Sequence, residues 1–237
     1  MEVHTVTHVN HVEGPKSQYR YLTWITVIYV AFQLISDVTA GKLISIYGFP
    51  TSIAVLYFPI TYLFSDILTE VYGYEQARSV LWKVLFASVT AGVVYQLTVY
   101  WPPASGFTIN QSYVDVFGQV WRILIGGWLA VFAGDIVNNY VMAKIKVLMN
   151  GKMLWVRAIA STITGQGVNT VIFYVVALYG IIPTTILLEA IVTGWLLKSA
   201  VEAVLLPFTY AVCRILKQRE GVDFYDVNTN FNPFIVK

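Results

Sequence analysis

The sequence predicts an all-α integral membrane protein with about six transmembrane helices. Hydrophobic residues make up 57% of the 237 positions and charged residues only 12%, whereas soluble domains carry about 25% charged residues. Apolar stretches of about 20 residues, the length that crosses the hydrocarbon core as a helix, recur along the chain. So much apolar surface cannot be hidden inside a water-soluble fold of this size.

The predicted spans follow these apolar stretches in order: 21–41, 52–71, 79–101, 119–145, 155–179 and 186–214. The third ends before a pair of prolines, and the sixth contains Pro207, which favours a kink. The fourth carries Gly126, Ala130 and Gly134 at four-residue spacing. Such a stripe of small residues is typical of close helix–helix contact. It could also join two copies of the chain into a homodimer.

The sequence therefore divides into three parts: a cytoplasmic N-terminal tail (1–20), a transmembrane domain (21–214) and a cytoplasmic C-terminal tail (215–237). His4, His8 and His11 would share one face of a helix and could bind a metal there. Their valine- and threonine-rich surroundings oppose a helix, so we expect a disordered tail and no metal site. The single cysteine, Cys213, excludes an intrachain disulfide. No nucleotide-binding motif is present, and we expect no cofactor.

Lysine and arginine predict the orientation, because they favour the cytoplasmic side. With six alternating spans, most of them fall on one side: Lys16, Arg20, Arg78, Lys83, Lys144, Lys146, Lys152, Arg157, Arg214, Lys217 and Arg219. Both termini are then cytoplasmic, and the chain is a multi-pass protein of the plasma or inner membrane. Two halves of three spans would have opposite orientations, the inverted repeat of many secondary transporters.

A pair of acids lies inside the second span. Each charged residue at the centre of a bilayer costs at least about 2.5–3.5 kcal/mol on insertion scales, so it needs a reason. Asp66 and Glu70 are four residues apart and share a helical face, with Thr61 and Tyr62 one turn earlier. The pair indicates a substrate or proton site. The alternative for Glu70 is a solvated position at the cytoplasmic interface, because it lies near the end of the span.

Two other spans carry polar pairs. In the sixth, Lys198 and Glu202 are one turn apart and Trp195 lies on the same side. They either neutralise each other within the helix or belong to a site. In the fifth, Gln166 and Asn169 face the same way. Such amides either join helices by hydrogen bonds or read the edge of a planar ligand.

Four separated stretches resemble the queuosine precursor transporter family, also described as putative vitamin uptake transporters. They are "FPITYLFSDILTEVYGYEQAR" (58–78), "LWVRAIASTITGQGVNTVIF" (154–173), "KSAVEAVLLPFTYAV" (198–212) and "DFYDVNTNFNPF" (223–234). The resemblance implies import of 7-deazaguanine bases, without an ATPase of its own, by alternating access to a site near the middle of the membrane. The expected partners are this small molecule and the lipid bilayer, and no nucleic acid.

The resemblance also implies a substrate site between the two halves. Asp66 or Glu70 would accept hydrogen bonds from the guanidine-like edge of the base, while Gln166 and Asn169 would contact it from the other half. The family commonly has aspartate where this chain has Asn169, and an asparagine carries no proton. The full set of expected substrate-binding residues is Thr61, Tyr62, Asp66, Glu70, Asn139, Gln166, Asn169, Trp195, Lys198 and Glu202.

Three alternatives to this function remain at the level of sequence. One is uptake of another vitamin-like heterocycle, with an energising partner. A second is an intramembrane enzyme that uses Asp66 and Glu70 as acid and base, although we expect a protein that is not an enzyme. The third is a structural subunit without a ligand.

Overall fold

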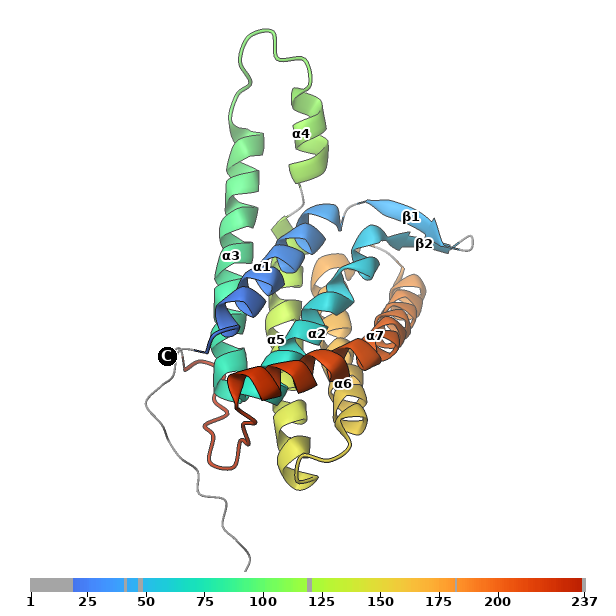
Figure 1. The fold of residues 1–237 in the computed structure, drawn as a ribbon. Helices are drawn as coiled ribbons and strands as arrows, with labels where there is room; N and C mark the ends of the chain where they lie inside the picture. Colours follow the sequence, from blue (N-terminus) through green and yellow to red (C-terminus); the bar gives the residue numbers. More distant parts are fainter. Residues whose placement is uncertain (1–18, 41, 47–48, 119–120, 182, 236–237) are drawn as a thin grey trace, which may run out of the picture.

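The computed structural model describes residues 19–40, 42–46, 49–118, 121–181 and 183–235 (Figure 1). Its elements in order are α1 (Leu22–Thr39), β1 (Leu43–Ile46), β2 (Phe49–Ser52), a 3₁₀ turn (Ile53–Leu56), α2 (Phe58–Tyr72), α3 (Tyr74–Tyr100), α4 (Asn110–Phe117), α5 (Trp121–Leu148), α6 (Leu154–Leu178) and α7 (Thr184–Glu220). The three histidines of the predicted N-terminal tail, His4, His8 and His11, lie outside the described residues.

The helices confirm the predicted fold class. Five of them, α1, α3, α5, α6 and α7, are long and apolar enough to cross a membrane. The second predicted span, 52–71, corresponds to α2, which has 15 residues, fewer than the roughly 20 that a straight span needs. The described residues therefore form five long apolar helices, the two shorter helices α2 and α4, a 3₁₀ turn and a small hairpin.

Helix α2 lies in the middle of the bundle and contacts α1, α3, α5 and α7 (Figure 1). Twelve of its 15 residues are buried, because neighbours surround it. The predicted start at residue 52 is wrong, since the helix begins at Phe58. Pro59 lies in its first turn, where the missing N–H of a proline is tolerated. Gly73 ends it with a positive φ of 83°, so α3 begins at the next residue.

A short antiparallel hairpin, which the all-helical prediction did not include, connects α1 to the region before α2. Strand β1 pairs with β2 in the register Leu43↔Ser52 to Ile46↔Phe49. The β-branched residues Ile44 and Ile46 favour an extended backbone. The stretch is also too short and too polar at its ends to form another span.

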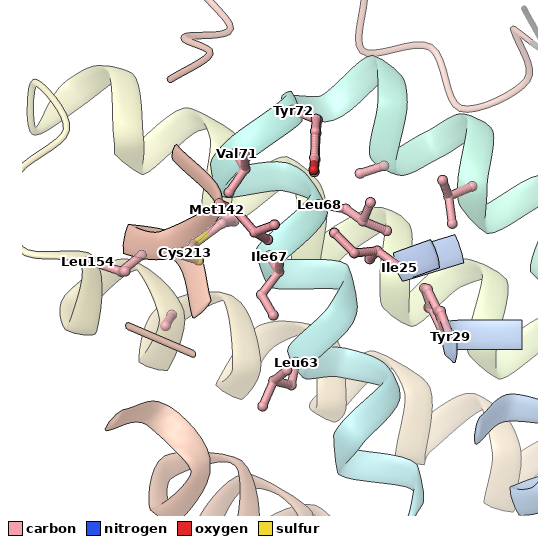
Figure 2. Packing of buried hydrophobic residues seen from close by; sticks show 14 of the residues in the cluster. Ile25, Tyr29, Leu63, Ile67, Leu68, Val71, Tyr72, Met142, Leu154 and Cys213 are labelled. Atoms are coloured by element: carbon pink, nitrogen blue, oxygen red, sulfur yellow. The ribbon is translucent and has the colours of Figure 1, made fainter. Parts of the chain in front are cut away.

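The apolar core surrounds α2 (Figure 2). Leu63, Ile67, Leu68 and Val71 of α2 are buried and pack against side chains of α1, α5, α6 and α7, among them Ile25, Met142, Leu154 and Cys213. In a bilayer, burial of these side chains exchanges lipid contacts for protein contacts. Close packing, rather than transfer from water, then stabilises the bundle.

Helices α5 and α6 approach each other closely along the small-residue stripe. A side chain at Gly126 would meet the backbone of α6 at Ala177, and one at Gly134 would meet the Gly165 carbonyl at 3.0 Å. The stripe is therefore a helix–helix contact, as predicted. Because α6 of the same chain covers it, the stripe does not offer a face for the homodimer that was expected from it.

We expect Gly134→Ala to destabilise the protein. The new Cβ would lie 2.7 Å from the Asn169 Cβ and against the Tyr62 hydroxyl, and overpacking of this kind costs about 1–3 kcal/mol. The matched control is Gly127→Ala on the same helix, where nothing lies within 4 Å of the new Cβ. Thermal unfolding in detergent should show a lower midpoint for Gly134→Ala only. Equal midpoints would contradict the close packing of α5 on α6.

The last part of the chain turns back onto the bundle. Helix α7 has 37 residues with Pro207 inside it, and it changes direction along its length (Figure 1). Residues 221–235, which we name the C-terminal strap, then pack against α2 and the start of α3. Asp226 of the strap accepts the backbone N–H of Tyr74 at 3.1 Å with both carboxylate oxygens. A negative charge at this helix N-terminus is favourable.

Side chains of α3 also hold the remainder of the strap. Arg78 Nη1 donates to two strap carbonyls, each at 2.7 Å. Trp82 Nε1 donates to a third at 2.9 Å. Gly73 allows this docking, because a Cβ there would collide with the ring of Phe224. The predicted cytoplasmic tail therefore begins within α7, and its described residues contact the helices.

Candidate functional site

A cavity of about 350 Å³ lies between α2, α6 and α7. This volume is within the range of about 300–1,000 Å³ that is typical of small-molecule sites. Its walls are mostly apolar, with a few polar side chains: Asp66, Thr162, Trp195, Ser199, Glu202 and Thr209. Three of the residues predicted from the sequence, Asp66, Trp195 and Glu202, therefore meet in one cavity.

Asp66 provides a carboxylate from the central helix. The residue is 2% exposed, and its Oδ1 accepts a hydrogen bond from Asn138 Nδ2 of α5 at 2.7 Å. An ionised carboxylate has about four acceptor positions, so this bond orients the group without using all of its capacity. Asp66 is thus a fixed acceptor in the wall of a mostly apolar cavity.

Glu202 provides a second carboxylate from α7, and its partners come from α6. Thr162 Oγ1 donates to it at 2.5 Å and Gln166 Nε2 at 3.2 Å. Lys198, one turn earlier, instead donates to Asn169 Oδ1 at 3.1 Å and lies 4.6 Å from the centre of the Phe58 ring. The mutual neutralisation of Lys198 and Glu202 considered from sequence is therefore not what the structure has.

Three further predicted residues, Thr61 and Tyr62 of α2 and Asn139 of α5, lie outside the cavity wall. Tyr62 donates to the Gly165 carbonyl at 3.5 Å. Asn139 accepts from Ser65 at 2.8 Å, and Thr61 donates to a carbonyl of its own helix at 2.6 Å. The contacts of Asn139 and Tyr62 join α2 to α5 and α6, respectively. The residues lie around the cavity but are not part of the surface that a ligand would meet.

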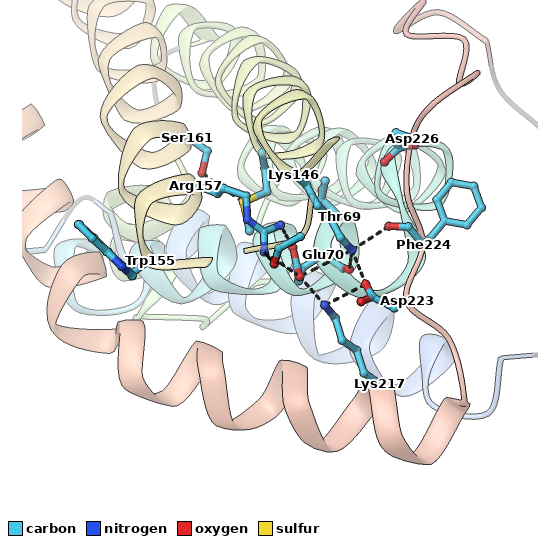
Figure 3. Close-up of polar contacts among 12 residues, drawn as sticks. Thr69, Glu70, Lys146, Trp155, Arg157, Ser161, Lys217, Asp223, Phe224 and Asp226 are labelled. Carbon is cyan, nitrogen blue, oxygen red and sulfur yellow. Dashed lines mark hydrogen bonds and ion pairs between the residues drawn. The ribbon is translucent and has the colours of Figure 1, made fainter. Parts of the chain in front are cut away.

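Glu70 belongs to a separate cluster of charges (Figure 3). Arg157 of α6 binds both of its carboxylate oxygens, at 2.5 and 3.2 Å. Lys217 of α7 lies 2.5 Å from Oε1, and Lys146 of α5 lies 3.6 Å from the same oxygen. Glu70 is only 1% exposed, so it is not solvated at an interface. Its partners saturate the carboxylate and join four helices.

Asp223 brings the C-terminal strap into the same cluster. It lies 2.5 Å from Lys146 Nζ and 2.9 Å from Lys217 Nζ. Partial burial alone would raise the pKa of Asp223, but the hydrogen bonds and charges of the two lysines hold it below its ordinary value. Lys146 also donates to the Phe224 carbonyl at 2.7 Å. Three cations and two carboxylates thus fix the strap to the ends of α2, α5, α6 and α7.

The sequence prediction of the site omitted Asp135 of α5. The residue is 1% exposed, and it accepts a hydrogen bond from the Tyr29 hydroxyl of α1. The sequence does show an acid inside an apolar span at this position. Such an acid is costly in a bilayer and is therefore a candidate functional residue. The helices that meet at Asp135 could not be identified from the sequence pattern.

Buried carboxylates in the wall of a cavity between long apolar helices are typical of a membrane transporter. Residues 52–212 match the family described as "Putative vitamin uptake transporter", and the chain belongs to this family. The family resemblance seen in the sequence is thereby confirmed.

Three curated relatives cover much of the chain. It is 26% identical over 195 residues to the "Probable queuosine precursor transporter" of Bacillus subtilis (strain 168), covering 81% of this chain and 85% of the relative. A protein of the same name from Haemophilus influenzae is 24% identical over 152 residues, covering 64% and 62%. The "Queuosine precursor transporter" of Escherichia coli (strain K12) is 23% identical over 169 residues, covering 71% and 74%. No solved structure matches the chain.

Proposed function

We propose that this protein imports queuosine precursors, which are 7-deazaguanine bases, through the cavity between α2, α6 and α7. The observation that carries the proposal is the buried Asp66 carboxylate in the wall of a cavity of about 350 Å³. The names of the curated relatives support the same substrate class.

The chemistry of the cavity suits such a base. A 7-deazaguanine has adjacent N–H donors on its guanidine-like edge, and one carboxylate can accept two of them. Asp66 is the candidate for this contact, with Asn138 holding its orientation. Trp195 gives the wall an aromatic surface, against which a flat ring can stack. Glu202 adds a second carboxylate, which would attract the cation of an aminomethyl derivative.

We further propose that transport is by alternating access. Helices α1–α3 and α5–α7 would form two inverted repeats, which move relative to each other around the cavity. Both termini would lie in the cytoplasm, because lysine and arginine are concentrated on that side in the predicted topology. The charge cluster around Glu70 and the strap would then close the cytoplasmic end in the conformation described here.

Uptake by purified protein in proteoliposomes tests the proposal. Labelled 7-deazaguanine base should enter the vesicles, unlabelled 7-deazaguanines should compete, and the base recovered from the lumen should be chemically unchanged. A vitamin without the guanidine-like edge, such as biotin, serves as the control competitor. Absence of both uptake and competition would contradict the proposed substrate, and recovery of a converted product would favour the intramembrane enzyme.

A further inference from the structure

A second buried acid lies next to the proposed substrate site but outside the cavity wall. Asp135 of α5 is 1% exposed. Its Oδ2 accepts the Tyr29 hydroxyl, and its Oδ1 has no hydrogen-bond partner among the described residues. Among the residues that the structure describes, all five ion pairs belong to the cluster around Glu70 and Asp223. Asp135 therefore lies in the membrane region without a cation to neutralise it.

The ionisable groups around Asp135 are predominantly acidic. The groups that interact electrostatically with Asp135 come from three other helices. They are Tyr29 of α1, Tyr62 and Asp66 of α2, and Glu202 of α7. Three carboxylates thus share this interior region, while one lysine, Lys198, lies nearby bound to Asn169. Ionised acids at membrane depth cost at least about 2.5–3.5 kcal/mol each, so this arrangement favours binding of a positive charge.

The cations of the other helices packed on α5 are engaged elsewhere. Arg78 of α3 binds the strap, and Arg157 of α6 binds Glu70. Lys146 of α5 itself binds Asp223, about three turns away from Asp135 by sequence. These three cations are thus engaged away from Asp135, and none of the five ion pairs among the described residues includes it.

Polar side chains connect Asp135 to the cavity. The hydroxyls of Tyr62 and Ser65 lie close to its carboxylate. Asn138, one turn further along α5, donates to Asp66 in the cavity wall. Asp135 and Asp66 are close enough for their charges to interact, although Asp135 does not line the cavity.

We propose that Asp135 is a proton-binding site that couples import of the substrate to inward movement of a proton. The inference rests on the proposed function. A proton taken from the outer solution makes the Asp135 carboxyl neutral, which favours the conformational change of the loaded protein. Release of that proton to the inner solution restores the carboxylate, and the Tyr29 hydroxyl then stabilises its charge. A proton is the ligand that fits, because the group is enclosed by hydroxyls and carboxylates and lies outside the cavity.

The test uses the full chain in proteoliposomes with a pH gradient that is acidic outside. A gradient of one pH unit corresponds to about 1.4 kcal/mol and can drive about tenfold accumulation for each proton carried. The unmodified protein should concentrate labelled 7-deazaguanine to about this extent, and a pH-sensitive dye should report loss of protons from the outside during uptake. Asp135→Asn should lose the accumulation but retain exchange of internal for external base.

Two further variants separate coupling from folding. Asp115→Asn on the exposed helix α4 is the matched control and should accumulate substrate normally. Tyr29→Phe removes the donor that stabilises the charged carboxylate, so its pH profile of uptake should move to higher pH. If Tyr29 only stabilised the fold, Tyr29→Phe would lower the amount of folded protein without shifting the pH profile of uptake.

Each outcome decides between the proposals. Accumulation by Asp135→Asn equal to that of the unmodified protein, or uptake by the unmodified protein without proton movement, overturns the coupling while leaving import intact. If Asp135→Asn does not fold, two measurements still test the coupling. One is the proton flux during uptake by the unmodified protein, and the other is the pH profile of uptake by Tyr29→Phe. Failure of the unmodified protein to bind or exchange any 7-deazaguanine overturns the proposed function, and coupling to this substrate with it.

Discussion

Asp66→Asn is expected to weaken binding of 7-deazaguanine by about 10- to 150-fold, which corresponds to about 1.5–3 kcal/mol for hydrogen bonds to a charged group. The asparagine oxygen can still accept from Asn138, so the packing around the residue is retained. The negative charge and one acceptor are lost, and the guanidine-like edge then faces an amide N–H donor in place of an acceptor. Calorimetry on the purified protein measures this change directly.

The control for this substitution is Asp115→Asn, which removes the same charge from the exposed helix α4. It should leave the dissociation constant unchanged. The thermal midpoint without ligand should be similar for both variants and the unmodified protein. Affinity of Asp66→Asn equal to that of the unmodified protein would show that this carboxylate does not bind the base.

Glu70→Gln is expected to produce the largest loss of stability. The substitution leaves Arg157, Lys146 and Lys217 with Asp223 as their one remaining carboxylate in the cluster. Removal of one partner from a buried ion pair costs about 3–5 kcal/mol, because a charge stays buried without compensation. The variant should unfold at a much lower temperature in detergent, and little folded protein should be recovered from the membrane.

A double substitution distinguishes this cause from loss of packing. In Glu70→Gln with Arg157→Gln, the uncompensated guanidinium is gone as well, so part of the stability should return. Glu189→Gln, at an exposed position of α7, is the matched control and should change stability by less than about 0.5 kcal/mol. If the double variant is no more stable than the sum of the two single losses, the ion pair is not the cause.

The fold class and the position of Asp66 could be predicted because they depend on local properties of the sequence. Apolar stretches define helices wherever lipid surrounds them. Asp66 stands out because a charge in such a stretch is costly. The short length of α2 could not be predicted in this way, since a helix enclosed by other helices need not match the thickness of the membrane.

The partners of Glu70 show why the rest of the site was not predictable. Its spacing from Asp66 indicated one shared site, and the two acids do lie on one helix. In the structure, Asp66 lines the cavity while Glu70 binds Arg157 of α6 and Lys217 of α7. These partners are 87 and 147 residues away in the chain. Helical periodicity describes which residues share a face, but not which distant residues meet that face.

If the substrate occupies the cavity between α2, α6 and α7, it should protect a cysteine introduced at Ser199 from a thiol reagent. Ser199 lines the cavity. The natural Cys213 is buried, so the unmodified protein gives the background rate of thiol labelling. Lys152→Cys, in the exposed turn after α5, is the control for reagent access. Saturating 7-deazaguanine should slow labelling of Ser199→Cys several-fold and leave that of Lys152→Cys unchanged. Equal labelling of Ser199→Cys with and without bound base would show that the base does not occupy this cavity.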